Sequence, residues 1–320
     1  MPVARRYKAT VLPGNNHALL QSALAARPWW HVVEGREAEG ERSDLWWGGN
    51  GQPYDWAGLQ AALPRAALPV VNKHGTHSCI CTKARLAHSL RRYARASGVD
   101  LSTIVPQTFV LVSNGKQQQV DAESAGFRAA AATAAACGLH LWIVKPGNSN
   151  RGRGIKVFDT AKAVELHVRR QKLGSEWVVQ KYIEPPLLLG GRKFDIRQFA
   201  LVTCDRRVFA YRDSYVRTCS RPFDASDTAD LAAHLSNDYV QKALESFGRF
   251  EDANKLSFEE FQAVLDETPL ADGRTLRFEA DLWPQVRASA CAAASASASA
   301  SARAREHRAC IGPTRARASS

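Results

Sequence analysis

The sequence predicts an α/β protein, because short apolar runs of strand length alternate with helical patterns along most of the chain. Residues 7–12 and 105–111 are mostly apolar runs of strand length. Residues 15–26, 82–96 and 122–137 have the length of helices, and in 82–96 apolar residues at Leu86 and Leu90 stand opposite arginines. Residues 139–287 continue this alternation of strand and helix, so both element types contribute to the core.

The same patterns divide the chain into four regions. We expect an N-terminal α/β subdomain over 1–70, which includes a short apolar strand at 44–47 before two glycines. A central subdomain of helices and a strand follows over 71–138, and the region 139–287 holds the chemically informative motifs. The last region, 288–320, is rich in alanine and serine and then in arginine, and this composition predicts disorder.

Length, apolar content and cysteine usage limit the protein class. The 320 residues are 45% hydrophobic, which is enough for a sizeable core. No run of 18 apolar residues occurs, and the first residues lack the apolar core of a secretory signal, so neither a membrane span nor secretion is expected. The seven cysteines are odd in number and scattered. They favour a reducing, cytoplasmic setting over a disulfide framework.

The charge balance predicts a polyanionic partner. The formal net charge is +12, from 43 lysines and arginines against 31 acidic residues. From Arg287 onward there are six arginines and one acid, Glu306, so part of this excess lies in the tail. No basic run interleaved with aromatic residues occurs. Nucleic acid is therefore the weaker choice. The charge alone leaves an acidic protein tail and an acidic membrane face open, and we expect the partner to be neither nucleic acid nor a membrane.

Four segments between residues 142 and 202 carry groups that can bind a phosphate or a carboxylate. Lys145 ends an apolar run and can reach a nucleotide phosphate. Gly152 and Gly154 lie in a basic loop, where backbone N–H groups can approach a triphosphate closely. The apolar run that ends at 180–183 can hold an adenine edge with its backbone. The pair of Asp195 and Arg197 can bind a metal ion or a phosphate on one side and a carboxylate on the other.

Taken in order, these segments resemble the tubulin–tyrosine ligase-like family. The resemblance rests on six motifs and covers roughly residues 7–287, with weaker similarity before residue 110. The motifs are residues 142–146, 151–155, 180–183, 191–197, 211–217 and 234–242. Residues 194–217 are most similar to the branch of the family that adds glycine.

The resemblance implies an ATP-grasp fold and an ATP-dependent ligation of a carboxylate to an amine through an acyl-phosphate. The implied substrates are a free amino acid, glycine or glutamate, and the acidic C-terminal tail of tubulin. The implied cofactors are ATP and Mg²⁺. It also implies a monomer that acts in the cytoplasm on the microtubule cytoskeleton, including that of a cilium or flagellum.

The resemblance further assigns a role to individual residues. Arg197 and Arg217 are the expected catalytic residues, because a guanidinium grips a planar carboxylate with two hydrogen bonds. Adenine is expected at residues 180–183, and the phosphates at Lys145 and Lys193. The full set expected to bind the nucleotide is Lys83, Lys145, Arg151, Gly152, Gly154, Ile155, Gln180, Lys181, Tyr182, Ile183, Lys193, Asp195, Ser236 and Asn237.

The sequence departs from the family at the metal site. The family's main magnesium ligands are an Asp and a Glu-x-Asn on later strands, and this chain carries no such pair after the helix expected to begin near Leu282. The C-terminal lobe is therefore expected to be incomplete. Two alternatives stay open: a catalytically deficient pseudoenzyme that binds microtubules, and a ligase that acts on another acidic protein.

Three further patterns have simpler interpretations than the ligand sites they suggest. The cluster His74, His77, Cys79 and Cys81 is too tightly spaced for one tetrahedral zinc ion. Residues 250–261 resemble the end of a calcium loop, but arginine and alanine would occupy ligand positions. We expect instead a helix capped by Ser257 and Glu260. The Trp29–Trp30 and Trp46–Trp47 pairs are expected in the core of the N-terminal region.

Overall fold

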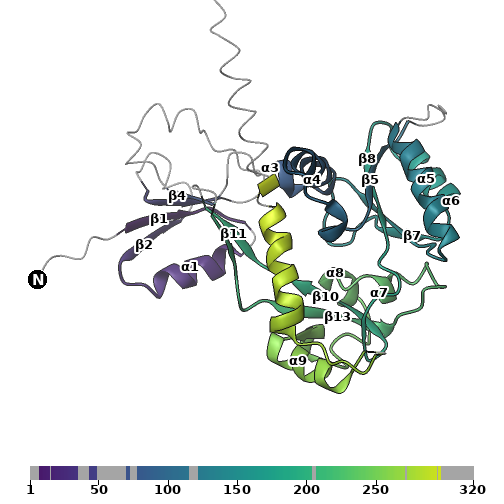
Figure 1. Cartoon of the computed structure of the whole chain (residues 1–320). Helices are drawn as coiled ribbons and strands as arrows, with labels where there is room; N and C mark the ends of the chain where they lie inside the picture. The colour runs from purple at the N-terminus through teal and green to yellow at the C-terminus, as the bar shows by residue number, and fades with distance from the viewer. Residues whose placement is uncertain are drawn as a thin grey trace, which may run out of the picture. The chain divides into compact units, whose positions relative to one another are not determined.

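The computed structural model describes residues 7–14, 16–34, 43–48, 70–72, 78–114, 122–203, 207–270, 272–293 and 295–296. The chain forms two compact units, residues 1–77 and 78–320, and each is described by itself. The predicted four-region division at residues 70, 138 and 287 stays a prediction. Within the described ranges the protein mixes helices and sheets, as the sequence predicts (Figure 1).

The first unit contains a parallel sheet with the strand order β2-β1-β3-β4. Its elements are β1 (Tyr7–Val11), α1 (His17–Ala25), β2 (Trp30–Glu34), β3 (Leu45–Trp47) and β4 (Val70–Val71). Trp30 and Trp47 pack against the small core of this unit. Trp29 is 46% exposed, so the expected burial of the tryptophan pairs is correct for one residue of the first pair and wrong for the other.

The second unit begins with an antiparallel sheet in the order β5-β8-β6-β7. Figure 1 shows α5 and α6 on one side of this sheet and α4 on the other. The side covered by α5 and α6 holds the main core, in which Phe127, Trp142 and Val179 are fully buried. The elements are α3 (Ser78–Cys81), α4 (Lys83–Ser97), η3 (Leu101–Thr103), β5 (Thr108–Val112), α5 (Ala122–Ala136), β6 (Trp142–Pro146), β7 (Lys156–Phe158), α6 (Ala161–Arg169) and β8 (Glu176–Lys181).

A second antiparallel sheet follows in the order β14-β13-β10-β9, with a separate two-stranded sheet formed by β11 and β12. Phe194 and Ile196 point from β10 into a core shared with α9. The opposite side of β10 therefore carries Lys193, Asp195 and Arg197. The elements are β9 (Leu188–Leu189), β10 (Arg192–Arg197), β11 (Ala200–Val202), β12 (Val208–Ala210), β13 (Tyr215–Pro222), α7 (Leu231–His234), α8 (Asp238–Gln241), η4 (Asp252–Asn254), β14 (Lys255–Leu256) and α9 (Phe258–Glu267).

The predicted capping of α9 is confirmed. Ser257 accepts a hydrogen bond from the Glu260 backbone N–H at 3.2 Å, and the Glu260 carboxylate accepts one from the Ser257 N–H at 2.7 Å. This reciprocal pair uses the side chains that a calcium loop would need. Of the tightly spaced histidines and cysteines for which no zinc site is expected, His74 and His77 lie outside the described residues.

The predicted disorder from residue 288 is wrong at its start. A π-helical turn at Phe278–Leu282 leads into an α-helix that covers residues 283–293. Alanine has the highest helix propensity, so the alanine-rich segment continues the helix past Arg287. Residues 297–320 lie outside the described part of the chain. Among the described helices, none combines the length and apolar character of a membrane span.

Candidate functional site

Three predicted lysines converge from three different elements. Lys83 is the first residue of α4, Lys145 lies near the end of β6, and Lys193 lies on β10. Burial lowers the pKa of Lys145 to about 8, and the nearby charges of Lys83 and Lys193 act in the same direction. Among the described residues, no carboxylate forms an ion pair with any of the three. Within the described ranges, the three ammonium groups therefore have no carboxylate partner.

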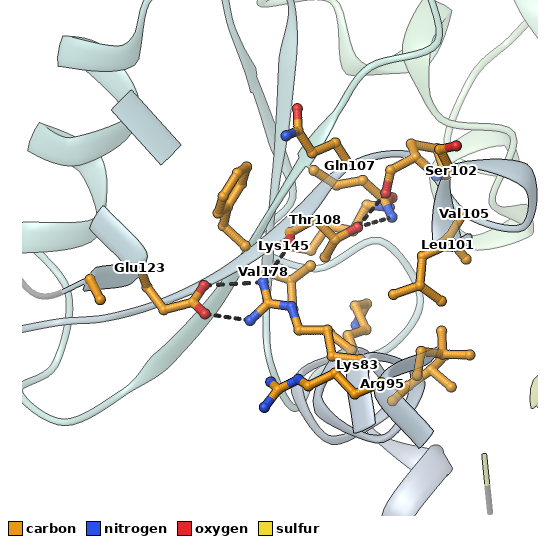
Figure 2. Close-up of a pocket in the computed structure, with 18 residues that line it drawn as sticks. Lys83, Arg95, Leu101, Ser102, Val105, Gln107, Thr108, Glu123, Lys145 and Val178 are labelled. Atoms are coloured by element: carbon orange, nitrogen blue, oxygen red, sulfur yellow. Dashed lines mark hydrogen bonds and ion pairs between the residues drawn. The ribbon is translucent and has the colours of Figure 1, made fainter. Parts of the chain in front are cut away.

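Lys145 is held in place by a chain of side-chain hydrogen bonds across the sheet. Its Nζ donates to Gln180 Oε1 at 2.7 Å, and Gln180 Nε2 donates to Thr108 Oγ1 at 2.8 Å. Thr108 Oγ1 in turn donates to the Pro106 carbonyl at 2.7 Å. Figure 2 shows Lys145 and Thr108 among the side chains that line a pocket. Each hydrogen bond of this chain is 2.7 or 2.8 Å long, so the ammonium position is fixed before any ligand binds.

Hydrogen bonds from Lys83 connect the start of α4 to the turn that follows β6. Its backbone N–H donates to the Gly147 carbonyl at 3.0 Å, and its Nζ bonds to the carbonyls of Pro146 and Ser149. Burial lowers the pKa of Lys83 as well. A Cβ at Gly147 would lie 2.9 Å from the Glu176 carbonyl, so this close approach requires glycine.

The glycine-bearing loop after β6 turns back on itself and reaches α8. Gly152 and Gly154 have φ values of +78° and +70°, which side chains with a Cβ rarely adopt. A Cβ at Gly154 would lie 2.8 Å from Pro146 Cγ, and one at Gly152 would lie 3.3 Å from Asn237 Oδ1. The loop thus brings together two of the predicted motifs. It resembles the nests of backbone N–H groups that bind anions.

The predicted adenine segment lies at the exit of β8. The N–H of Lys181 donates to the Gln107 carbonyl at 2.8 Å, and that of Tyr182 to the Leu141 carbonyl at 3.1 Å. The Lys181 ammonium is engaged by Glu184 and by the Leu141 carbonyl. The Lys181 side chain therefore has a structural role. Ile183 is the most exposed residue of the segment, at 64%.

An apolar cluster adjoins this segment. Leu141, Val157 and Tyr182 are buried together, with Ile143 and Phe223 packed against them. The Tyr182 and Phe223 rings are stacked with centroids 6.2 Å apart, and the Tyr182 hydroxyl shares a 2.9 Å hydrogen bond with His234 Nδ1. Burial raises the pKa of Tyr182, so this ring stays neutral. The cluster is a small buried core directly beside the predicted adenine segment.

The two predicted catalytic arginines have different surroundings. Arg217 on β13 donates two hydrogen bonds to Asp195, at 2.8 and 2.6 Å, and these bonds raise its pKa. Arg197 is exposed and lies over the Phe199 ring at 5.1 Å. Asp195 is therefore paired with Arg217 across the strands and not with Arg197. Arg217 keeps its remaining N–H groups for a second carboxylate.

The described residues lack a cluster of metal-ligand side chains. They contain no group of three or more His, Cys, Asp or Glu side chains placed to hold a metal ion. Both Asp195 oxygens accept hydrogen bonds from Arg217, which leaves this carboxylate less available as a ligand. The lysine cluster and the glycine loop, by contrast, have the charge and backbone geometry that a triphosphate requires.

The contacts of several site residues could not be recognised from the sequence. Thr108 and Gln180 meet across the β5–β8 register, which no local pattern reveals. His234 is 1% exposed, and its Nε2 lies 3.0 Å from the Asp227 carbonyl. Ser236 is 6% exposed, and Asn237 begins α8 beside the glycine loop. Motif order alone points to these two residues, and the structure brings Asn237 next to Gly152.

Comparison with known proteins gives the same assignment as the motifs. The model of the Tubulin-tyrosine ligase family matches residues 63–313. The chain is 36% identical to Tubulin glycylase 3B of Tetrahymena thermophila over 150 residues, which are 46% of this chain and 12% of that protein. It is 42% identical to human Tubulin monoglycylase TTLL3 over 137 residues (40% of this chain, 18% of that protein).

A third relative is the human Protein monoglycylase TTLL8, 42% identical over 112 residues, which are 33% of this chain and 13% of that protein. The aligned segments thus span less than a fifth of the length of these relatives. All three relatives are named as glycylases.

Proposed function

Because the chain belongs to the tubulin-tyrosine ligase family, we propose that it is an ATP-dependent ligase that adds an amino acid to glutamate side chains of tubulin tails. Glycine is the favoured amino acid, since the matched relatives are glycylases, and glutamate is the alternative. The proposal places a monomeric enzyme in the cytoplasm at the microtubule cytoskeleton, including that of cilia or flagella.

The observation that carries the proposal is the cluster of Lys83, Lys145 and Lys193. Three ammonium groups from separate elements converge, and among the described residues none forms an ion pair with an acid. Such an arrangement is costly unless a polyanion completes it. A nucleoside triphosphate supplies that charge, and Gln180, which accepts a hydrogen bond from Lys145, belongs to the segment expected to hold its adenine.

In the proposed reaction, an oxygen of the acceptor carboxylate attacks the γ-phosphorus of ATP, and the bond to the β-phosphate oxygen breaks with release of ADP. The amine of the free amino acid then attacks the acyl carbon, phosphate leaves with the bonding electrons, and the nitrogen loses a proton. The residues contribute by orientation and by neutralising charge.

Each part of the site has a role in this proposal. Lys83, Lys145 and Lys193 bind the phosphates, and Arg151 with the backbone from Gly152 to Ile155 covers their far end. The segment 180–183 holds the adenine. Arg217, oriented by Asp195, binds the acceptor carboxylate, with Arg197 beside it. Ser236 and Asn237 supply polar contacts near the loop.

A second candidate is a microtubule-binding pseudoenzyme. The lack of a metal-ligand group among the described residues favours it, because phosphoryl transfer normally requires magnesium to neutralise charge. It differs from the ligase in binding tubulin tails without turning over ATP. A ligase that acts on another acidic protein would instead turn over ATP without tubulin.

Calorimetry of ATP binding, with and without magnesium, tests the proposal. We expect Lys145→Ala to weaken ATP binding at least about tenfold, the factor associated with one charge-assisted hydrogen bond. The matched control is Lys162→Ala, which removes an exposed lysine of α6 and should leave binding unchanged. Unchanged ATP affinity in Lys145→Ala would contradict the proposed phosphate site.

Incorporation of labelled glycine or glutamate into tubulin then separates the candidates. Glycine incorporation that requires ATP supports the glycylase, and tail binding without incorporation supports the pseudoenzyme. ATP turnover without tubulin supports the third candidate.

A further inference from the structure

His234 is a fully buried histidine to which the proposed reaction gives no role. It is the last residue of α7 and is 1% exposed, so both of its ring nitrogens need partners inside the protein. Its Nε2 lies 3.0 Å from the Asp227 carbonyl oxygen, and its Nδ1 lies 2.9 Å from the Tyr182 hydroxyl. The histidine therefore connects the turn before α7 with the segment that follows β8.

The surroundings of the His234 ring define where its proton lies. Burial is the main cause that lowers the pKa of His234, and the charge of Lys193 acts in the same direction, so the ring is neutral at neutral pH. A carbonyl oxygen can only accept a hydrogen bond, so Nε2 carries the proton and donates it to Asp227. Nδ1 is then the acceptor, and the Tyr182 hydroxyl donates to it.

Three rings pack together around this hydrogen bond. His234 meets both Tyr182 and Phe223 nearly at right angles, with centroid distances of 5.5 and 5.3 Å. Tyr182 and Phe223 are themselves stacked, with an angle of 17° between their planes. Edge-to-face and stacked pairs are both favourable aromatic geometries. Because His234 contacts both rings and is hydrogen-bonded through both nitrogens, it restricts the tilt of the Tyr182 ring.

The Tyr182 ring in turn contacts one of the three clustered lysines. The Lys193 ammonium lies 5.5 Å from the centroid of the Tyr182 ring, a distance at which the electron-rich face of the ring attracts a cation. Lys193 and Lys83 also lie close enough to Lys145 to lower its pKa by repulsion. This repulsion favours positions of the flexible Lys193 side chain outside the cluster. The contact with the Tyr182 ring opposes it, so the orientation of that ring affects where the ammonium lies.

We propose that His234 is a positioning residue of the phosphate site: through its hydrogen bond to Tyr182, it orients the ring that keeps the Lys193 ammonium in the lysine cluster. This inference rests on the proposed function, because the phosphates of ATP are the ligand for which the ammonium is held in place. His234 itself brings no charge to the phosphates and acts through Tyr182 and Lys193.

The test is a double-mutant cycle on the full chain, with ATP affinity measured by displacement of a fluorescent ATP analogue. His234→Phe keeps an aromatic ring in place and removes both hydrogen bonds. It should weaken ATP binding by about three- to tenfold, the range for one neutral hydrogen bond. In the Lys193→Met background, the same substitution should change ATP affinity by less than about twofold, because the ammonium that it displaces is already absent.

The matched control is His167→Phe. His167 lies on α6 and contacts the Phe158 and Trp177 rings, so the substitution repeats the same chemical change in a different aromatic cluster. It should change ATP affinity by less than about twofold, below the effect of one hydrogen bond. If His234 were merely structural, His234→Phe would cause equal losses of affinity with and without Lys193→Met, and that result would overturn the inference.

Tyr182→Phe covers the case in which His234→Phe does not fold. It removes the same hydrogen bond from the other side and keeps the ring, so its effect on ATP affinity should also disappear in the Lys193→Met background. If ATP binding depends on Lys145 but ignores both substitutions, the inference about His234 alone is wrong. If the unaltered protein does not bind ATP, the ligase proposal fails and this inference fails with it.

Discussion

The ammonium group of Lys145 lies where its own charge is disfavoured. Burial lowers its pKa from 10.5 to about 8, and Lys83 and Lys193 add repulsion. The unfolded chain therefore binds more protons than the folded chain between about pH 8 and 10.5. Stability of the ligand-free protein is expected to rise with pH through this window, and below about pH 8 the penalty is fully present.

Replacement of this lysine separates binding from stability. We expect Lys145→Met to weaken ATP binding by about 10- to 100-fold, because a charged hydrogen bond to phosphate is lost. The ligand-free variant should unfold at the same temperature or higher, because the methionine fills a similar volume without a buried charge. Calorimetry and thermal unfolding measure the two effects. A clear loss of stability would show that the lysine is structural.

The lowered pKa also predicts proton uptake on binding. At pH 8 about half of the Lys145 side chains are neutral, and a bound phosphate favours the charged form. ATP binding at pH 8 should therefore take up a fraction of a proton, up to about one half. Calorimetry in two buffers of different ionisation enthalpy measures this uptake. The uptake should vanish near about pH 6, where Lys145 is already charged.

Gly154 gives a residue-scale test of the loop. Gly154→Ala should destabilise the protein by about 1–3 kcal/mol and weaken ATP binding, because the φ of +70° is strained and the Cβ meets Pro146. The matched control is Gly174→Ala, which has a φ of +77° but nothing within 4 Å of its Cβ. It should lower stability by about 1 kcal/mol and leave nucleotide affinity unchanged. Chemical denaturation and calorimetry compare the pair.

At the scale of elements, one buried ion pair connects the strands of the second antiparallel sheet. Arg192 of β10 donates to Glu251 and to the Cys219 carbonyl at 3.0 Å, and Thr218 donates to the same carboxylate at 2.7 Å. Arg192 and Glu251 are 9% and 12% exposed. The pair therefore connects β10, β13 and the segment before β14 at the place where Asp195 and Arg217 must meet.

Removal of one partner should unfold this lobe first. Arg192→Leu is expected to cost about 3–5 kcal/mol, because Glu251 would remain buried without its counter-charge. The control is Arg212→Leu, whose pair with Glu279 is 76% and 59% exposed and should contribute little. Denaturant unfolding of both variants measures the difference. Similar losses in the two would contradict the special role of the buried pair.

Element positions could be predicted well from sequence where local patterns decide them. The expected helices 82–96 and 122–137 correspond to α4 and α5. The strand expected from 105 begins only at Thr108, because Pro106 has no N–H to donate to a ladder. The Asp195–Arg217 and Lys145–Gln180 contacts could not be predicted. Both depend on which strands become neighbours and in which register.

At the scale of the whole molecule, the positive charge is not spread evenly. Some described acids pair with arginines, as in the Arg128–Glu165 and Arg192–Glu251 pairs, whereas no described carboxylate pairs with the three lysines. The net charge of +12 predicts a polyanionic ligand, and that stays a prediction. The total charge alone could not indicate that three lysines from separate elements lie close together.

The lysine cluster lowers the stability of the ligand-free protein, and the proposed activity requires this cluster. This is a stability–function trade-off built into the phosphate site, and ordinary multivalent anions can relieve it. Phosphate, sulfate or citrate in a storage buffer should raise the melting temperature and should also act as weak competitors of ATP. Protein kept in such buffers should therefore show a higher melting temperature and a lower activity than the same protein in chloride.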